Sequence, residues 1–171
     1  MDVTTRLFSF PDPVNEVSAR LVAGGVVLMA LATIVLDQPW MTAVIAYGFL
    51  ARVATGPTLS PLGQLVTRVV TPWLTARGVA PRPVPGPPKR FAQGIGAAFS
   101  VTAAVLALGL GLPGAAYGVL GALVVAAGLE SLAGLCLGCK AFAVLMRWGV
   151  IPAAVCERCT DLWSGRPANA A

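Results

Sequence analysis

The four cysteines of this chain form two Cys-x-x-Cys pairs, Cys136/Cys139 and Cys156/Cys159. Two thiols three positions apart can act as a redox couple or supply half of a metal site. Other chemistry has few residues to use, because the sequence contains no histidine and only seven carboxylates. A Ser/His/Asp triad is therefore excluded, and no phosphate-binding glycine loop occurs in the sequence. The sequence predicts sulfur chemistry.

The first pair lies where a long apolar segment ends. Gly134 and Gly138 permit a break there, and a second helix can begin near Lys140. A cysteine at a helix N-terminus beside a lysine has its thiolate stabilised by the helix dipole and by the positive charge. In this interpretation Cys136 attacks and Cys139 resolves, by analogy with other Cys-x-x-Cys motifs. If the helix runs through without a break, both thiols lie on one face and are small packing residues.

The second pair opens a metal-binding alternative. The spacing C-x2-C-x16-C-x2-C falls within the zinc-ribbon pattern of four thiolates. Zinc or an Fe–S cluster held by Cys136, Cys139, Cys156 and Cys159 would fasten the tail to the helix end. Against this, residues 141–150 read as an apolar helix, whereas zinc ribbons usually have hairpins there. A third interpretation is a thiol relay, in which the second pair passes electrons or sulfur to the first.

The composition is that of an integral membrane protein. Hydrophobic residues make up 57% of the chain and charged residues 11%, and the mean hydropathy is +0.80. Soluble domains carry about twice that share of charge. No charged residue occurs between Arg90 and Glu130, which leaves room for two crossings of about 20 residues each. The net charge of +5 does not predict nucleic-acid binding, because the basic residues flank the apolar runs.

Turn signals divide each apolar run into two helices. Residues 37–39 (Asp-Gln-Pro) separate 21–36 from 40–51, and residues 111–114 separate 91–110 from 115–129. A shift of the sequence by 70 aligns Ala-Tyr-Gly at 46–48 with Ala-Tyr-Gly at 116–118. These patterns predict an all-α fold, an integral membrane four-helix bundle of two pseudo-repeated helical hairpins.

The expected organisation is one membrane domain with five segments. Between the hairpins, Leu62, Leu65, Val66, Val69, Val70 and Trp73 fall on one helical face, which is typical of a helix lying in the headgroup region or packing on the bundle. The segments are hairpin 1 (14–56), the interfacial amphipathic helix (57–79), a Pro-rich linker (80–89), hairpin 2 (90–135) and a Cys-bearing cytosolic segment (136–171).

Basic residues indicate the orientation. They occur before the first helix, between the hairpins and after the last helix, and the two tight turns contain none. The positive-inside rule then places both termini and the middle segment in the cytoplasm, together with the cysteines. Residues 1–20 are mixed polar without a small-residue cleavage site, so we expect the first helix to be retained.

Glu130 is the one acid deep in the second hairpin. Intramembrane acids usually pair with a base or serve function. Arg52, at a similar depth on the second helix, is the expected partner in a structural ion pair. Proton transfer is the alternative, although Glu130 and Cys139 would point to opposite sides of an unbroken helix.

Three short motifs resemble those of the bacterial membrane-protein family called domain of unknown function 4395. They are Pro-Lys-Arg-Phe-Ala-Gln-Gly at 88–94, Ser-Pro-Leu-Gly at 60–63 and Leu-Cys-Leu-Gly-Cys at 135–139. The resemblance implies a small multi-helix protein of the bacterial cytoplasmic (inner) membrane, often found in the company of thioredoxin-like and sulfurtransferase-like proteins. Members typically stop soon after the first cysteine pair, so the resemblance shifts weight from the four-cysteine metal site to redox or sulfur handling.

The expected function is a membrane-anchored thiol/disulfide or sulfur relay using Cys136 and Cys139 with a thioredoxin-like or rhodanese-like partner. It requires no cofactor. One alternative is a structural or scaffold subunit with a four-cysteine zinc or Fe–S site. The other is a subunit that transports a small sulfur species, for which the helices offer few polar residues.

Overall fold

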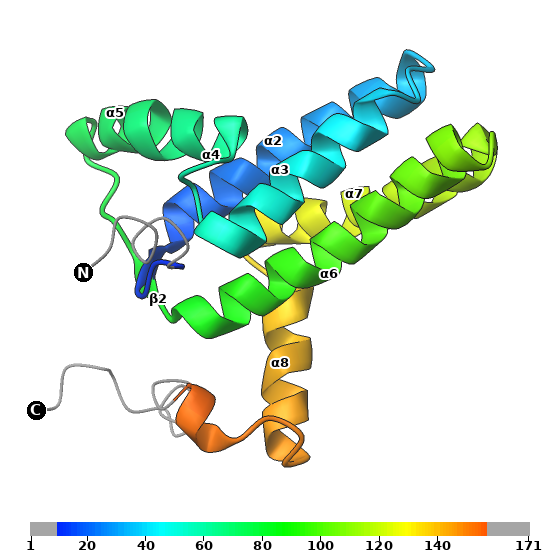
Figure 1. Ribbon diagram of the computed structural model, residues 1–171. Coiled ribbons are helices and arrows are strands. Elements are labelled where there is room, and N and C mark those ends of the chain that lie inside the picture. Colours follow the sequence, from blue (N-terminus) through cyan, green and yellow to red (C-terminus); the bar gives the residue numbers. More distant parts are fainter. Residues whose placement is uncertain (1–9, 157–171) are drawn as a thin grey trace, which may run out of the picture.

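The computed structural model describes residues 10–156, and this part of the chain is mostly helical (Figure 1). The elements run in the order β1 (Val14–Asn15), α2 (Glu16–Val35), α3 (Met41–Thr55), α4 (Pro61–Leu65), a π-helical segment (Val66–Val70), α5 (Thr71–Ala76), β2 (Pro83–Val84), α6 (Gly86–Ala104), a second π-helical segment (Val105–Gly109), α7 (Pro113–Ala133), α8 (Leu137–Arg147) and a 3₁₀ turn (Ala153–Val155).

Three helices are long and apolar enough to cross a membrane. They are Glu16–Val35, Gly86–Gly109 and Pro113–Ala133, with mean hydropathies between 1.7 and 1.9. The fourth apolar helix, α3, has 15 residues. These lengths and compositions confirm the prediction of a helical, membrane-type protein.

The four apolar helices pack across the two hairpins rather than mainly within them. The most extensive contacts join α2 to α7 and α3 to α6, whereas α2 and α3 touch less. Small residues make the close approach, with Ala30, Ala103 and Ala116 fully buried around Leu120 and Ile45. At Gly96 of α6, an added Cβ would lie 2.1 Å from the Phe49 ring, so glycine is needed where these helices cross.

The two tight turns lie at the same end of the molecule, on the right of Figure 1. Asp37 takes a left-handed conformation (φ 50°) after α2, and Gly111 does the same (φ 64°) before α7. The turn signals read from the sequence therefore end these helices. Cys136 and Cys139 lie at the opposite end of α7, where α8 begins.

The segment expected to be an amphipathic helix is a continuous rod of α4, π-helix and α5. Part of its polar side faces the protein, where the hydroxyls of Thr71 and Ser18 of α2 share a hydrogen bond of 2.9 Å, whereas Arg68 is exposed. Leu65, Val69 and Trp73 are more than half exposed on the outside. The residues of the expected apolar face are thus divided between the inside and the outside, since Val66 is buried. The π-helical turn shifts which side chains share a face of the helix.

The Pro-rich segment is shorter than expected and is tied to the start of α2. Val84 pairs with Val14 and Pro83 with Asn15 in a two-residue antiparallel ladder. The Asn15 side chain also accepts a hydrogen bond from the Val17 N–H at 3.0 Å and so caps α2. Because α6 begins at Gly86, the end of the expected linker belongs to a helix.

Candidate functional site

The cysteine pair begins a new helix. α7 ends at Ala133, and Gly134 takes the left-handed conformation (φ 68°) that commonly closes a helix. Cys136 is the N-cap of α8, which departs from the spanning helices at a steep angle (Figure 1). The helix therefore breaks between the long apolar run and the thiols, and Cys139 lies in the first turn of α8.

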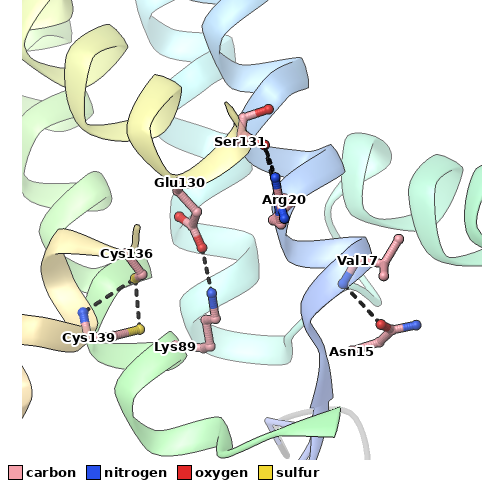
Figure 2. A network of polar contacts seen from close by, with 8 residues as sticks. All are labelled: Asn15, Val17, Arg20, Lys89, Glu130, Ser131, Cys136 and Cys139. Atoms are coloured by element: carbon pink, nitrogen blue, oxygen red, sulfur yellow. Dashed lines mark hydrogen bonds and ion pairs between the residues drawn. The ribbon is translucent and has the colours of Figure 1, made fainter. Parts of the chain in front are cut away.

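The two sulfur atoms lie within bonding reach of each other. The Cys136 Sγ accepts a hydrogen bond from the Cys139 N–H at 3.3 Å, and the Cys139 Sγ lies 2.7 Å from it (Figure 2). Both are free thiols; Cys136 is buried and Cys139 is partly exposed. A disulfide bond is about 2.05 Å long, so oxidation of this pair by a two-electron acceptor would require only a small movement of the two sulfur atoms.

Gly138 explains how α8 can start so close to the spanning helices. A Cβ at this position would lie 2.6 Å from both the Cα and the Cβ of Ala92 on α6. Further along, the rings of Phe142 and Phe91 meet edge to face with centroids 5.6 Å apart. The glycine between the cysteines therefore lets the dithiol rest directly on α6.

A buried ion pair lies beside the thiols. The Lys89 Nζ donates to the Glu130 Oε1 at 2.7 Å, and the side chains are only 10% and 16% exposed (Figure 2). The pair joins the start of α6 to the end of α7, which the antiparallel hairpin brings together. On the other side of this end, Arg20 donates to the Ser131 carbonyl oxygen at 3.0 and 3.1 Å.

The predicted ion pair between Glu130 and Arg52 is wrong. Arg52 instead donates from Nε to the Gln93 Oε1 at 3.0 Å and from Nη1 to the Ser60 Oγ at 3.1 Å. Its guanidinium also lies over the Phe49 ring at 4.5 Å. The expected pair rested on the similar depth of Glu130 and Arg52 in their helices, and Lys89 was assigned to the linker. The position of Lys89 just before an apolar run could have indicated that it belongs to a helix.

The surroundings of the two thiols shift their pKa values in opposite directions. The hydrogen bond from Cys139 lowers the pKa of Cys136, and the Lys89 charge lowers it further against the effects of burial and Glu130. The same hydrogen bond, together with burial and the Cys136 charge, raises the pKa of Cys139. The N-terminus of α8 favours a thiolate at Cys136 as well. A lower pKa at Cys136 than at Cys139 agrees with the order expected from other Cys-x-x-Cys motifs, in which Cys136 attacks and Cys139 resolves, and that order stays a prediction.

The thiols line an open pocket of about 530 Å³. Its walls are the Pro-rich segment before α6, the loop before α8 and the first turns of α8 itself. The described residues that line it are Glu16, Pro83, Val84, Pro85, Pro88, Lys89, Gly134, Leu135, Cys136, Cys139, Lys140, Phe142 and Ala143. The surface is mostly apolar and includes the charged residues Glu16, Lys89 and Lys140.

The second cysteine pair falls at the limit of the described chain. Cys156 is buried and disulfide-bonded, and Cys159 lies outside the described residues. Between residues 10 and 156 no group of three or more His, Cys, Asp or Glu side chains is placed to hold a metal. A four-cysteine zinc or Fe–S site needs Cys159 and stays a prediction.

Fold and site together define a small helical membrane-type protein with a dithiol at a helix N-terminus. The chain belongs to the family described as domain of unknown function (DUF4395), whose model matches residues 14–147. The match includes Cys136 and Cys139 and ends before Cys156. No curated protein and no solved structure matches the chain.

Proposed function

We propose that this protein is a membrane-anchored thiol/disulfide or sulfur-relay protein in which Cys136 reacts and Cys139 resolves. The observation that carries the proposal is the position of Cys136 as the N-cap of α8, with its sulfur 2.7 Å from that of Cys139. A thiolate at a helix N-terminus beside a resolving thiol is the arrangement that thiol–disulfide exchange requires.

In the redox form, the Cys136 thiolate attacks one sulfur of a partner disulfide. The partner's S–S bond breaks, a mixed disulfide forms, and the departing partner thiolate takes a proton. Cys139 then loses its proton and attacks the Cys136 sulfur, which releases the second partner thiol and leaves a Cys136–Cys139 disulfide. Two electrons pass from the dithiol to the partner, and the reverse sequence returns them.

In the sulfur form, the Cys136 thiolate attacks the outer sulfur of a partner persulfide. The product is a Cys136 persulfide and a free partner thiol. Cys139 can then attack the Cys136 inner sulfur, which expels hydrosulfide and closes the same disulfide. A thioredoxin-like or a rhodanese-like protein would supply the respective partner group, and the open pocket beside the thiols gives it access.

The proposed location is the bacterial cytoplasmic membrane, with four crossings and both termini in the cytoplasm. α3 is short for a crossing, but its packing along α6 and the turn that it shares with α2 support the same depth for it. Neither tight turn carries a lysine or arginine. The outward Leu65, Val69 and Trp73 support the α4–α5 rod as an interfacial helix.

The test is to trap the mixed disulfide. The purified full-length protein in lipid nanodiscs is reduced and mixed with an oxidised thioredoxin, and products are resolved on non-reducing gels. Cys139→Ser should accumulate a covalent adduct through Cys136, whereas Cys136→Ser should not. Persulfide transfer is tested in parallel with a persulfide-loaded rhodanese and mass spectrometry of Cys136.

Cys156→Ser/Cys159→Ser is the matched control, because it removes two cysteines and leaves the α8 pair. It should form and resolve the adduct as the native protein does. The proposal fails if Cys139→Ser accepts neither disulfide nor persulfide sulfur. It fails also if the native sample holds about one zinc per chain on all four cysteines.

A further inference from the structure

The guanidinium of Arg52 is buried without a counter-charge. Arg52 is 5% exposed at the end of α3, and its partners are the neutral side chains of Gln93 and Ser60 and the ring of Phe49. No carboxylate within residues 10–156 forms an ion pair with Arg52. The ion pair in this part of the chain joins Lys89 to Glu130. Its second terminal nitrogen, Nη2, makes no hydrogen bond to a described residue.

An uncompensated charge in such a place is costly. Burying an ion costs several kcal/mol even after the protein relaxes, and buried charges are normally paired. Phe49 and the C-terminal end of α3 offset part of this cost. Lys89, which is equally buried, has Glu130. Arg52 therefore leaves a positive electrostatic potential in an apolar part of the protein.

Arg52 lines a pocket of about 220 Å³ that is separate from the thiol pocket. The pocket lies between the start of α2, the end of α3, α4 and the start of α6. It is lined by Phe10, Pro11, Pro13, Val14, Asn15, Ser18, Ala19, Val22, Arg52, Gly56, Pro57, Gly63, Thr67, Lys89 and Gln93. This described lining contains two cations and no acid.

We infer that this pocket binds an oxyanion that carries an apolar body. The head would receive hydrogen bonds from the free edge of the Arg52 guanidinium, whose planar fork suits phosphate, sulfate and carboxylate oxygens. Asn15, Ser18 and Thr67 are further polar groups of the same wall, while Val14, Ala19 and Val22 face the apolar part. The head group of an anionic lipid and a soluble organic anion share this chemistry.

The site is independent of the thiol reaction. The two pockets share one lining residue, Lys89, whose charge is already held by Glu130. Binding at Arg52 requires neither cysteine. The inferred anion site therefore goes beyond the proposed relay, and it is tested independently of the relay.

The experiment measures ligand binding to the full-length protein in a neutral detergent after delipidation, by titration calorimetry. Sulfate and hexyl sulfate are the soluble probes, and dihexanoyl phosphatidylglycerol is the lipid probe. At least one should bind at one site per chain, and Arg52→Gln should weaken it by about tenfold or more. Arg68→Gln removes an exposed arginine from the nearby rod and should bind as the native protein does.

The pattern of probes identifies the source of the anion. Binding of phosphatidylglycerol alone indicates a lipid head group, and binding of either sulfate indicates a soluble anion. If Arg52→Gln does not fold, Ala19→Leu narrows the pocket while keeping every hydrogen bond of Arg52, with exposed Ala43→Leu as its control. The inference is overturned if no probe binds, or if Arg52→Gln or Ala19→Leu binds as tightly as the native protein.

Discussion

Tyr117 donates its hydroxyl hydrogen to the Asp37 carboxylate at 2.7 Å, and this contact joins the turn of the first hairpin to the beginning of α7. The turn after α2 and the start of α7 must then lie at the same level. Both tight turns are consequently on one side of the spanning helices. The dithiol, at the other end of α7, is on the opposite side.

Cysteine labelling should reveal this two-sided arrangement in cells. In a variant with all four cysteines replaced by serine, Gln38→Cys in the first turn should react with an impermeant maleimide added outside. Arg77→Cys, beyond α5, should react only after the membrane is opened, because it lies on the side of the basic residues. Both positions are exposed. Equal labelling from outside would contradict the orientation.

The two thiols should show different pH profiles of alkylation. The lowered pKa of Cys136 means that more of it is thiolate at any given pH, so its iodoacetamide rate should reach half its maximum below the ordinary thiol pKa of about 8.5. The raised pKa of Cys139 should displace its profile to higher pH. Mass spectrometry of the single variants Cys139→Ser and Cys136→Ser gives each profile separately. Because the hydrogen bond between the two thiols is the largest cause of both shifts, the native pair should show the full separation between the two profiles.

Breaking the buried ion pair should weaken both the fold and the nucleophile. Lys89→Met leaves Glu130 buried and unpaired, which should cost about 3–5 kcal/mol of unfolding free energy. The alkylation rate of Cys136 at neutral pH should also fall about threefold or more, since the Lys89 charge lowers its pKa. Denaturant unfolding in detergent micelles and timed alkylation measure the two effects.

The double variant Lys89→Met/Glu130→Leu separates these effects. It removes both charges, so most of the lost stability should return. Arg82→Gln, which removes an exposed cation next to Pro83 of the thiol pocket, should change neither the stability nor the alkylation rate of Cys136. If the double variant is as unstable as Lys89→Met, the loss of stability does not come from the unpaired charge of Glu130, and that explanation is contradicted.

A methyl group between the cysteines should displace the dithiol. Gly138→Ala places a Cβ 2.6 Å from the Ala92 backbone, so α8 must move away from α6 at a cost of about 1–3 kcal/mol. Gly94→Ala on α6 is the matched control, because no atom lies within 4 Å of its added Cβ. It should be neutral or slightly stabilising, as alanine favours helix. Thermal unfolding with both variants gives the comparison, and equal midpoints would contradict the contact.

The sequence predicted what depends on local chain chemistry. Hydropathy located the apolar helices, Asp37 and Gly111 marked their turns, and Gly134 marked the break before Cys136. The partner of Glu130 was not predictable in this way, because the choice between Arg52 and Lys89 depends on how four helices pack. The inward polar side of the α4–α5 rod was missed as well. A π-helical turn changes which side chains share a face of the helix, and no residue type within 66–70 predicts such a turn.

The packing of α2 on α7 and of α3 on α6 also bears on how the chain is made. As the first hairpin emerges from the ribosome, the surfaces that will later meet α6 and α7 face lipid. Because the second hairpin supplies the partners for both contacts, we expect the native arrangement to be completed only after α6 and α7 have entered the membrane. Two separately translated pieces divided at the Pro-rich stretch would be expected to find each other in the bilayer, since each one presents the surface that the other lacks.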